Sequence, residues 1–215
     1  RSTPVFPESR QPHPAGHREM PTVSPCLTQP EVLILAFLSG MAVLGLEVLW
    51  TRMLVQVLQN SFYSFALILS VFIIALSAGS GAAALLSVSR LPPHTVLFFL
   101  LAGAGFLAGF SPFVFMELTD GLVYMGNNFT LQAVFTAVAA VILPPGLLMG
   151  ALFPYLIKMS EPFSRSAGST VGRLAAINTA GAIIGSLCAG FIFLNFFGLW
   201  VSIRLVAFMY LCAAI

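Results

Sequence analysis

Glu47 lies inside a stretch of the chain that is otherwise almost entirely apolar, from Val32 to Leu58. In a helix that enters a bilayer near Val32, Glu47 lies roughly 22 Å along the helix axis, still within the hydrocarbon core of about 30 Å, where its side chain cannot easily reach water. An ionised carboxylate at such a depth costs a few kcal/mol, so it must be protonated, paired or turned toward a watery cavity. Two hypotheses follow: Glu47 belongs to a structural ion pair or hydrogen-bonded lock, or it belongs to a substrate or proton site.

A partner for this acid has to come from another helix. Arg52 is a poor candidate because five residues turn it about 140° away from Glu47 on an α-helix. Arg204 is expected on the same side of the membrane, which makes it the natural partner. Arg52 itself is expected to snorkel to the far interface, with Trp50 as an anchor at the same level.

A second polar group is expected inside a later apolar segment. Arg173 lies near the opposite interface, and Asn178 is five residues deeper, where its amide needs a hydrogen-bond partner. We therefore take Glu47, Asn178 and Arg204 as candidate substrate-binding residues. Trp50, Arg52 and Arg173 are expected to have interfacial or structural roles.

No pattern of residues typical of an enzyme or a metal site accompanies these groups. The chain has no glycine-rich nucleotide loop, no Ser/His/Asp set and no cluster of carboxylates in a water-facing region. His13 and His17 have helical ligand spacing, but Pro14 between them disfavours the helix. The cysteines match neither a metal site nor a redox motif. We expect no catalytic residue, no metal and no cofactor in these 215 residues.

Composition indicates the solvent in which the chain folds. Hydrophobic residues make up 59% of the sequence and charged residues 7%, which is too few to cover a water-facing surface. The formal net charge is +2 and there is no basic run, so nucleic acid is not an expected partner. Lipid must therefore surround much of the folded chain.

Six apolar segments pass the length test of roughly 20 residues per bilayer crossing. We predict an all-α, polytopic integral membrane bundle formed by residues 31–215, preceded by a disordered or extended, proline-rich tail at residues 1–30. Ile215 ends in the middle of an apolar run, so we expect the domain to be incomplete at its C-terminus. The predicted segments are about Val32–Val55, Ser64–Leu86, Thr95–Met116, Leu131–Ile157, Val171–Phe197 and Leu199–Ile215.

Small residues predict where these helices touch, because close backbone approach drives association in lipid. They are concentrated in "SAGSGAAA" (77–84) and "AGAIIGSLCAG" (180–190), in the second and fifth segments. The first and fourth segments also each end with an aromatic near a charge. The pattern predicts a three-plus-three repeat, as in many transporters. The expected packing glycines are Gly79, Gly181, Gly185 and Gly190.

The distribution of Lys and Arg near the segment ends predicts the orientation, since cytoplasmic loops are enriched in both residues. Five basic residues fall on the side that holds the N-terminus and two on the other side, so we expect the N-terminus in the cytoplasm. The five are Arg18, Arg90, Lys158, Arg165 and Arg173, and the two are Arg52 and Arg204.

The ordered motifs resemble those of a known family. "SGMAVLGLEVLWTRML" is similar to the opening of the membrane domain in bacterial proteins that fuse a transporter-like bundle to a spermidine synthase-like domain. Three further motifs follow in the order found in that family. They are a helix rich in small residues ("FALILSVFIIALSAGSGAAALLSVSR"), the proline-containing "LPPGLLMGALFP", and "NTAGAIIGSLCAGFIFLNFFGL". The resemblance covers residues 32–204.

The resemblance implies a transporter-like domain in the bacterial inner membrane. Such a domain would bind or pass a small solute, for example a polyamine, or anchor a cytoplasmic synthase-like domain. Any aminopropyltransferase-like chemistry would lie beyond residue 215, so no catalytic residue carries over. A different class of function stays open, namely a non-catalytic subunit that holds other membrane subunits by its Gly and Ala faces.

Overall fold

The computed structural model describes residues 27–58, 62–89, 91–123, 131–161 and 167–215. Most of the predicted tail, including both histidines discussed above, lies outside these ranges. Within them every regular element is helical, which confirms the predicted all-α bundle. In chain order the helices are α1 (Gln29–Leu54), α2 (Phe62–Ser87), α3 (Pro93–Leu118), α4 (Leu131–Met159), α5 (Ala167–Leu187), the π-helix η2 (Cys188–Phe193), α6 (Leu194–Phe196) and α7 (Gly198–Ala213).

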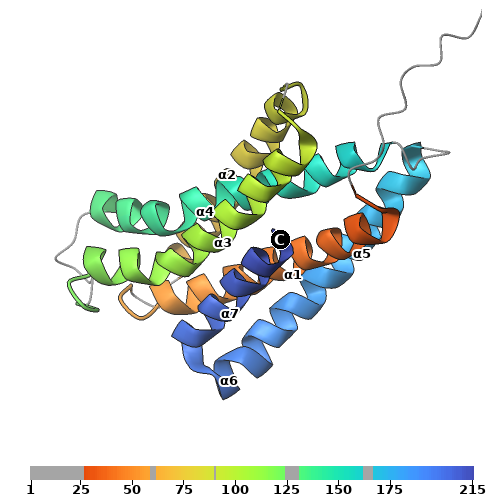
Figure 1. Ribbon diagram of the computed structural model, residues 1–215. Helices are drawn as coiled ribbons and strands as arrows, with labels where there is room; N and C mark the ends of the chain where they lie inside the picture. The colour runs from red at the N-terminus through yellow and green to blue at the C-terminus, as the bar shows by residue number, and fades with distance from the viewer. Residues whose placement is uncertain (1–26, 59–61, 90, 124–130, 162–166) are drawn as a thin grey trace, which may run out of the picture.

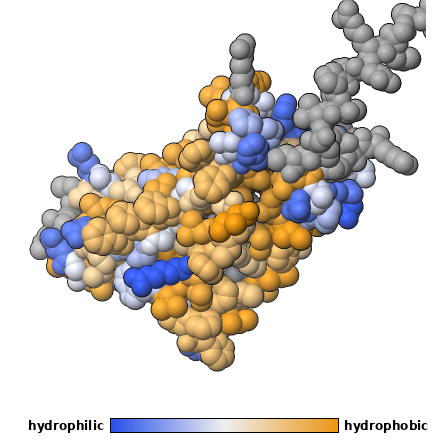
Figure 2. Space-filling view, viewed as in Figure 1, coloured by the Kyte–Doolittle hydropathy of each residue, from blue (hydrophilic) through white to orange (hydrophobic). Residues whose placement is uncertain are grey.

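Five spans in the described part of the chain are long and apolar enough to cross a membrane. Four of them are α1 to α4, and the fifth runs from Gly168 to Phe196 through α5, η2 and α6. The last helix, α7, has 16 residues and a length of roughly 24 Å. Figure 2 shows apolar side chains over most of the visible face, with polar ones gathered mainly at its ends. The chain is therefore an integral membrane protein whose apolar surface faces lipid.

Local chemistry explains several helix boundaries. Thr28 caps α1, and its backbone N–H donates to the Glu31 carboxylate at 2.7 Å, which satisfies a donor at the helix end. The fifth span was predicted as one continuous α-helix, but its last part widens into the π-helix η2. The span then ends before Gly198, whose φ of 71° is in the left-handed region that favours glycine.

The helices form two groups of three (Figure 1). In one group α4 lies between α2 and α3, and in the other α1 lies between α5 and α7. The most extensive contacts are those of α2 with α4 and of α1 with α5. Contacts between α1 and α4 and between α3 and α7 join the two groups. Exchanging α1, α2 and α3 with α4, α5 and α7, respectively, leaves this contact pattern unchanged.

The same exchange relates individual residues. A Cβ added at Gly79 in α2 would overlap the carbonyl oxygen of Leu147 in α4, and one added at Gly185 in α5 would overlap that of Met41 in α1. Gly185 follows Gly79 by 106 positions, and Leu147 follows Met41 by the same number. Each helix and its counterpart in the other half are three crossings apart. Because three is an odd number, the two halves run in opposite directions through the membrane. The contacts thus have the pattern of an inverted three-plus-three repeat.

A contact between α3 and α7 locates the two-fold axis of this repeat. A Cβ added at Gly105 would lie 3.1 Å from Cγ of Leu211, the residue 106 positions later. A residue that touches its own counterpart must lie close to the axis that relates the two. The α3–α7 crossing is therefore at the axis, and so is the contact between α1 and α4.

Candidate functional site

A cavity of about 490 Å³ lies between α1, α2, α4 and α5, in the size range of small-molecule sites. Its apolar wall straddles the axis of the repeat, because Val43 and Leu44 on α1 line it together with Met149 and Gly150 on α4, their counterparts 106 positions later. The polar side chains in the wall come from three helices. They are Ser39 on α1, Ser77 and Ser80 on α2, and Asn178 on α5.

A proline in the wall interrupts the backbone hydrogen bonding of α4. Pro154 lies inside the helix and has no N–H, so the carbonyl of Gly150, four residues earlier, lacks its usual helical partner. Both residues line the cavity. Although Pro144, Pro145 and Pro154 lie inside α4, the helix continues from Leu131 to Met159.

Asn178 is the one predicted substrate-binding residue that the structure places in the wall of this cavity. It lies where α5 crosses α1, and a Cβ added at Gly40 would overlap its backbone carbonyl oxygen and lie 2.9 Å from its side-chain Oδ1. The absence of a side chain at Gly40 therefore lets Asn178 approach α1 closely, which is how an amide in lipid finds polar backbone neighbours.

Glu47 lies close to the cavity but outside its wall. It follows Leu44 by three residues and Val43 by four, on the same helix face and one turn closer to the C-terminal end of α1. Its side chain is half-buried.

The structure does not bring Glu47 and Arg204 together as an ion pair. Within the residues described, no nitrogen–oxygen contact of 4.0 Å or less joins them, although α1 and α7 pack against each other. Arg204 is exposed on α7. Arg52 and Arg173 are also exposed, near the C-terminal end of α1 and in the first two turns of α5, respectively. The role of Glu47 stays open between the two hypotheses.

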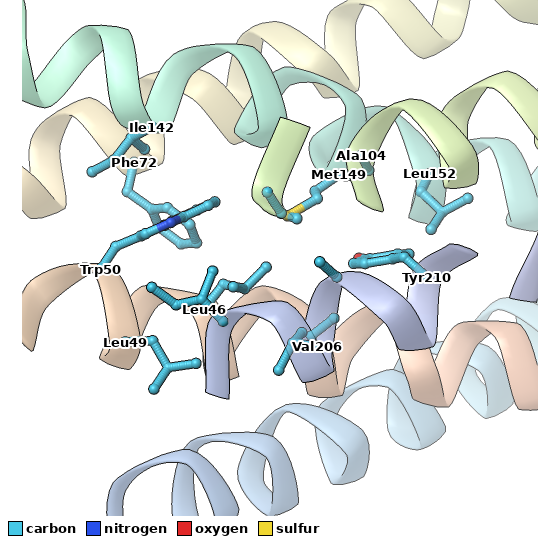
Figure 3. Packing of buried hydrophobic residues seen from close by; sticks show 14 of the residues in the cluster. Leu46, Leu49, Trp50, Phe72, Ala104, Ile142, Met149, Leu152, Val206 and Tyr210 are labelled. Atoms are coloured by element: carbon cyan, nitrogen blue, oxygen red, sulfur yellow. The ribbon is translucent and has the colours of Figure 1, made fainter. Parts of the chain in front are cut away.

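Trp50 is placed differently from the sequence-based expectation. An interfacial anchor would face lipid, but Trp50 has an exposed fraction of 0% and lies among the core side chains (Figure 3). Its indole N–H donates to Ser111 on α3 at 2.9 Å, and its ring meets Phe72 on α2 edge to face at 6.3 Å. Trp50 therefore joins three helices in the interior, because a buried indole needs an acceptor that α3 supplies.

The three serines in the cavity wall were not among the predicted site residues. Ser77 and Ser80 belong to the small-residue stretch 77–84, which was interpreted as a packing surface, and Gly79 between them does pack against α4. On a helix, residues one or two positions apart point in different directions, so one stretch serves both purposes. The sequence feature that could have identified these serines is the pair of hydroxyl residues on either side of the packing glycine Gly79.

Ser39 connects the cavity to a second buried hydroxyl. It has an exposed fraction of 1% and lies beside the hydroxyl of Tyr210 on α7. Tyr210 is buried among core side chains (Figure 3), and among the described residues its hydroxyl makes no hydrogen bond of ordinary geometry. Behind the cavity wall there is thus an unpaired polar group next to a serine that faces the cavity.

Of the glycines predicted at helix contacts, Gly79, Gly181 and Gly185 each lie where an added Cβ would overlap a backbone carbonyl of the neighbouring helix. Gly190 packs more loosely, because a Cβ added there would lie 4.0 Å from Cγ1 of Val48.

A metal site is absent from the described ranges. No group of three or more His, Cys, Asp or Glu side chains there is close enough together to hold a metal ion. Comparison of the chain with protein-family models, with curated proteins and with solved structures finds no match.

Proposed function

We propose that this membrane domain binds and passes a small solute through the cavity between α1, α2, α4 and α5. The observation that carries the proposal is an open cavity of about 490 Å³, lined by hydroxyl and amide side chains, in a bundle of otherwise apolar helices. Polar groups within a membrane are costly and tend to mark solute pathways. The inverted repeat supports the proposal as well, because transporters often place their sites at a repeat interface.

The finer parts of this proposal rest on the resemblance. These are a polyamine as solute, a location in the bacterial inner membrane with the N-terminus in the cytoplasm, and a synthase-like domain that the bundle would anchor. Glu47, one turn from the cavity wall, is the intramembrane acid that could contact an ammonium group. The cavity supports the transport version of this proposal.

Replacing Asn178 by Leu is expected to lower solute uptake at least tenfold, because the amide is the largest hydrogen-bonding side chain in the cavity wall. The measurement is uptake of glycerol, myo-inositol and spermidine into proteoliposomes that contain the full chain. Thr179→Leu is the matched control, since Thr179 is the next residue of α5 and is exposed. Uptake of no probe above that of empty liposomes, or uptake unaffected by Asn178→Leu, would contradict the proposal.

Replacing Glu47 by Gln separates the two hypotheses for this acid. The described residues provide it with no ion-pair partner, so we expect the variant to stay folded, with a change in unfolding free energy below about 1 kcal/mol. Spermidine uptake, measured as above, is expected to fall if the carboxylate contacts a cationic solute. Persistent spermidine uptake would remove Glu47 from the solute pathway, and loss of the folded bundle would favour the structural lock.

A second function, that of a subunit in a larger membrane assembly, is favoured by a different observation. α2 and α5 expose small residues, and a Cβ added at Gly81 or Gly172 would meet nothing within 4 Å. Such faces allow another helix to approach closely. Stoichiometric partners that co-purify with the full chain and are lost on Gly81→Leu would support this reading over the solute proposal.

A further inference from the structure

The polar groups of the cavity wall are all uncharged. Among the described residues that line it, the side chains able to hydrogen-bond are three serines and one asparagine. None of the described lining residues carries a charged side chain, and the nearest acid along α1, Glu47, lies one turn outside the wall. From this chemistry we propose that the cavity binds a neutral, hydrogen-bonding solute of the polyol or amide class.

The wall offers both donors and acceptors, which defines the ligand more closely. Serine hydroxyls do both, and the asparagine amide donates through its nitrogen and accepts through its oxygen. A neutral molecule that carries several hydroxyl or amide groups satisfies such a mixture. A polyammonium ion has donors alone, so it would leave the donor capacity of the wall unused and would bury several charges against at most one carboxylate.

The polar groups of the wall are specific to one side of the repeat. The counterpart of Asn178 is Phe72, and the counterpart of Ser77 is Ile183. The two halves therefore share the glycines at which their helices pack closely, but they do not share these polar side chains.

The unpaired hydroxyl behind the wall points to the same chemistry. Ser39 lies between the cavity and the Tyr210 hydroxyl, so it can accept from the tyrosine while it donates to a molecule in the cavity. A bound solute would thus order a two-member chain of hydroxyls. This inference rests on the proposed function and names a ligand class for the same site, and it replaces the polyamine that the resemblance suggests with a neutral solute.

The test measures how fast a cysteine in the wall reacts with thiol reagents of different charge. Ser77→Cys is placed in the full chain with Cys26, Cys188 and Cys212 replaced by Ala, and the protein is reconstituted in liposomes. The reagents are three methanethiosulfonates, carrying a hydroxyethyl, a trimethylammonium-ethyl or a sulfonatoethyl group. Each rate is divided by that of Ser89→Cys, an exposed position just beyond the end of α2.

We expect the neutral reagent to react at least roughly tenfold faster, after this normalisation, than either charged reagent, because none of the described lining residues carries a charge that would attract a charged reagent. Millimolar myo-inositol is expected to slow the reaction, and spermidine is not. An equal or faster reaction with the cationic reagent, or protection by spermidine alone, would overturn the neutral-solute inference and leave the proposed function standing. A Ser77→Cys thiol that reacts with no reagent, while the control thiol reacts, would overturn the proposed function as well.

Discussion

Replacing Gly79 by Ala is expected to lower the free energy of unfolding by about 1–3 kcal/mol, the usual range for overpacking a well-packed interior. The added Cβ would overlap the Leu147 carbonyl oxygen and lie 3.0 Å from the backbone nitrogen of Ala151. Both atoms belong to the backbone of α4, so no side chain can rotate away and the helices must separate. The measurement is denaturant unfolding of the chain in detergent micelles.

Gly81→Ala, two residues later on the same helix, is the matched control. A Cβ at Gly81 meets nothing within 4 Å, so its main effect is the better helix propensity of alanine, a gain of roughly 0.5–1 kcal/mol. The two substitutions are therefore expected to have opposite signs. Equal effects would show that the α2–α4 crossing is not as close as the structure places it.

The repeat makes this prediction for a second crossing. Gly185→Ala is expected to destabilise the chain about as much as Gly79→Ala, because its Cβ would overlap Met41 backbone atoms on α1. Gly172→Ala is the control on α5, where open space surrounds the added atom. A large cost at one crossing and none at the other would argue against two equivalent halves.

Replacing Trp50 by Ala is expected to cost about 3–5 kcal/mol of unfolding free energy, the range for deleting a large buried aromatic. The loss has two sources: the cavity left between α1, α2 and α3, and the hydrogen bond to Ser111. Phe191→Ala is the control, because Phe191 is 75% exposed and contributes to no buried cluster. An effect as small as that of Phe191→Ala would favour the interfacial position expected from the sequence.

The contribution of the hydrogen bond is measured separately. Ser111→Ala leaves the indole N–H buried without its acceptor and is expected to cost about 1–3 kcal/mol. Trp50→Phe removes the donor, so the double variant is expected to lose less than the two single losses together. Additive losses would show that the 2.9 Å contact contributes little to stability.

The helices themselves were predictable from the sequence. The predicted segment Val32–Val55 corresponds to α1 at Gln29–Leu54, and Ser64–Leu86 corresponds to α2 at Phe62–Ser87. The boundaries are local properties, since the backbone in lipid must satisfy its hydrogen bonds within each segment. A run of apolar residues long enough to cross the bilayer therefore defines a helix without reference to its neighbours.

The site was predictable only in part. A lone amide in an apolar segment needs polar neighbours wherever the helix packs, and for that reason Asn178 could be singled out before its position was known. Ser39, Ser77 and Ser80 could not, because a serine in a small-residue stretch has the same appearance whether it faces a cavity or a neighbouring helix. Their role depends on which way each helix is rotated.

The sequence by itself determined the solvent, the helical class and the approximate ends of each crossing, because hydropathy and backbone hydrogen bonding act within a single segment. The tertiary structure decided that Trp50 is buried, that Glu47 lies one turn from a cavity, and which serines line that cavity. These helices are apolar on all sides, so no periodicity in the sequence indicates the packed face. Only the close approach of backbones at glycines such as Gly79 and Gly185 establishes how each helix is turned.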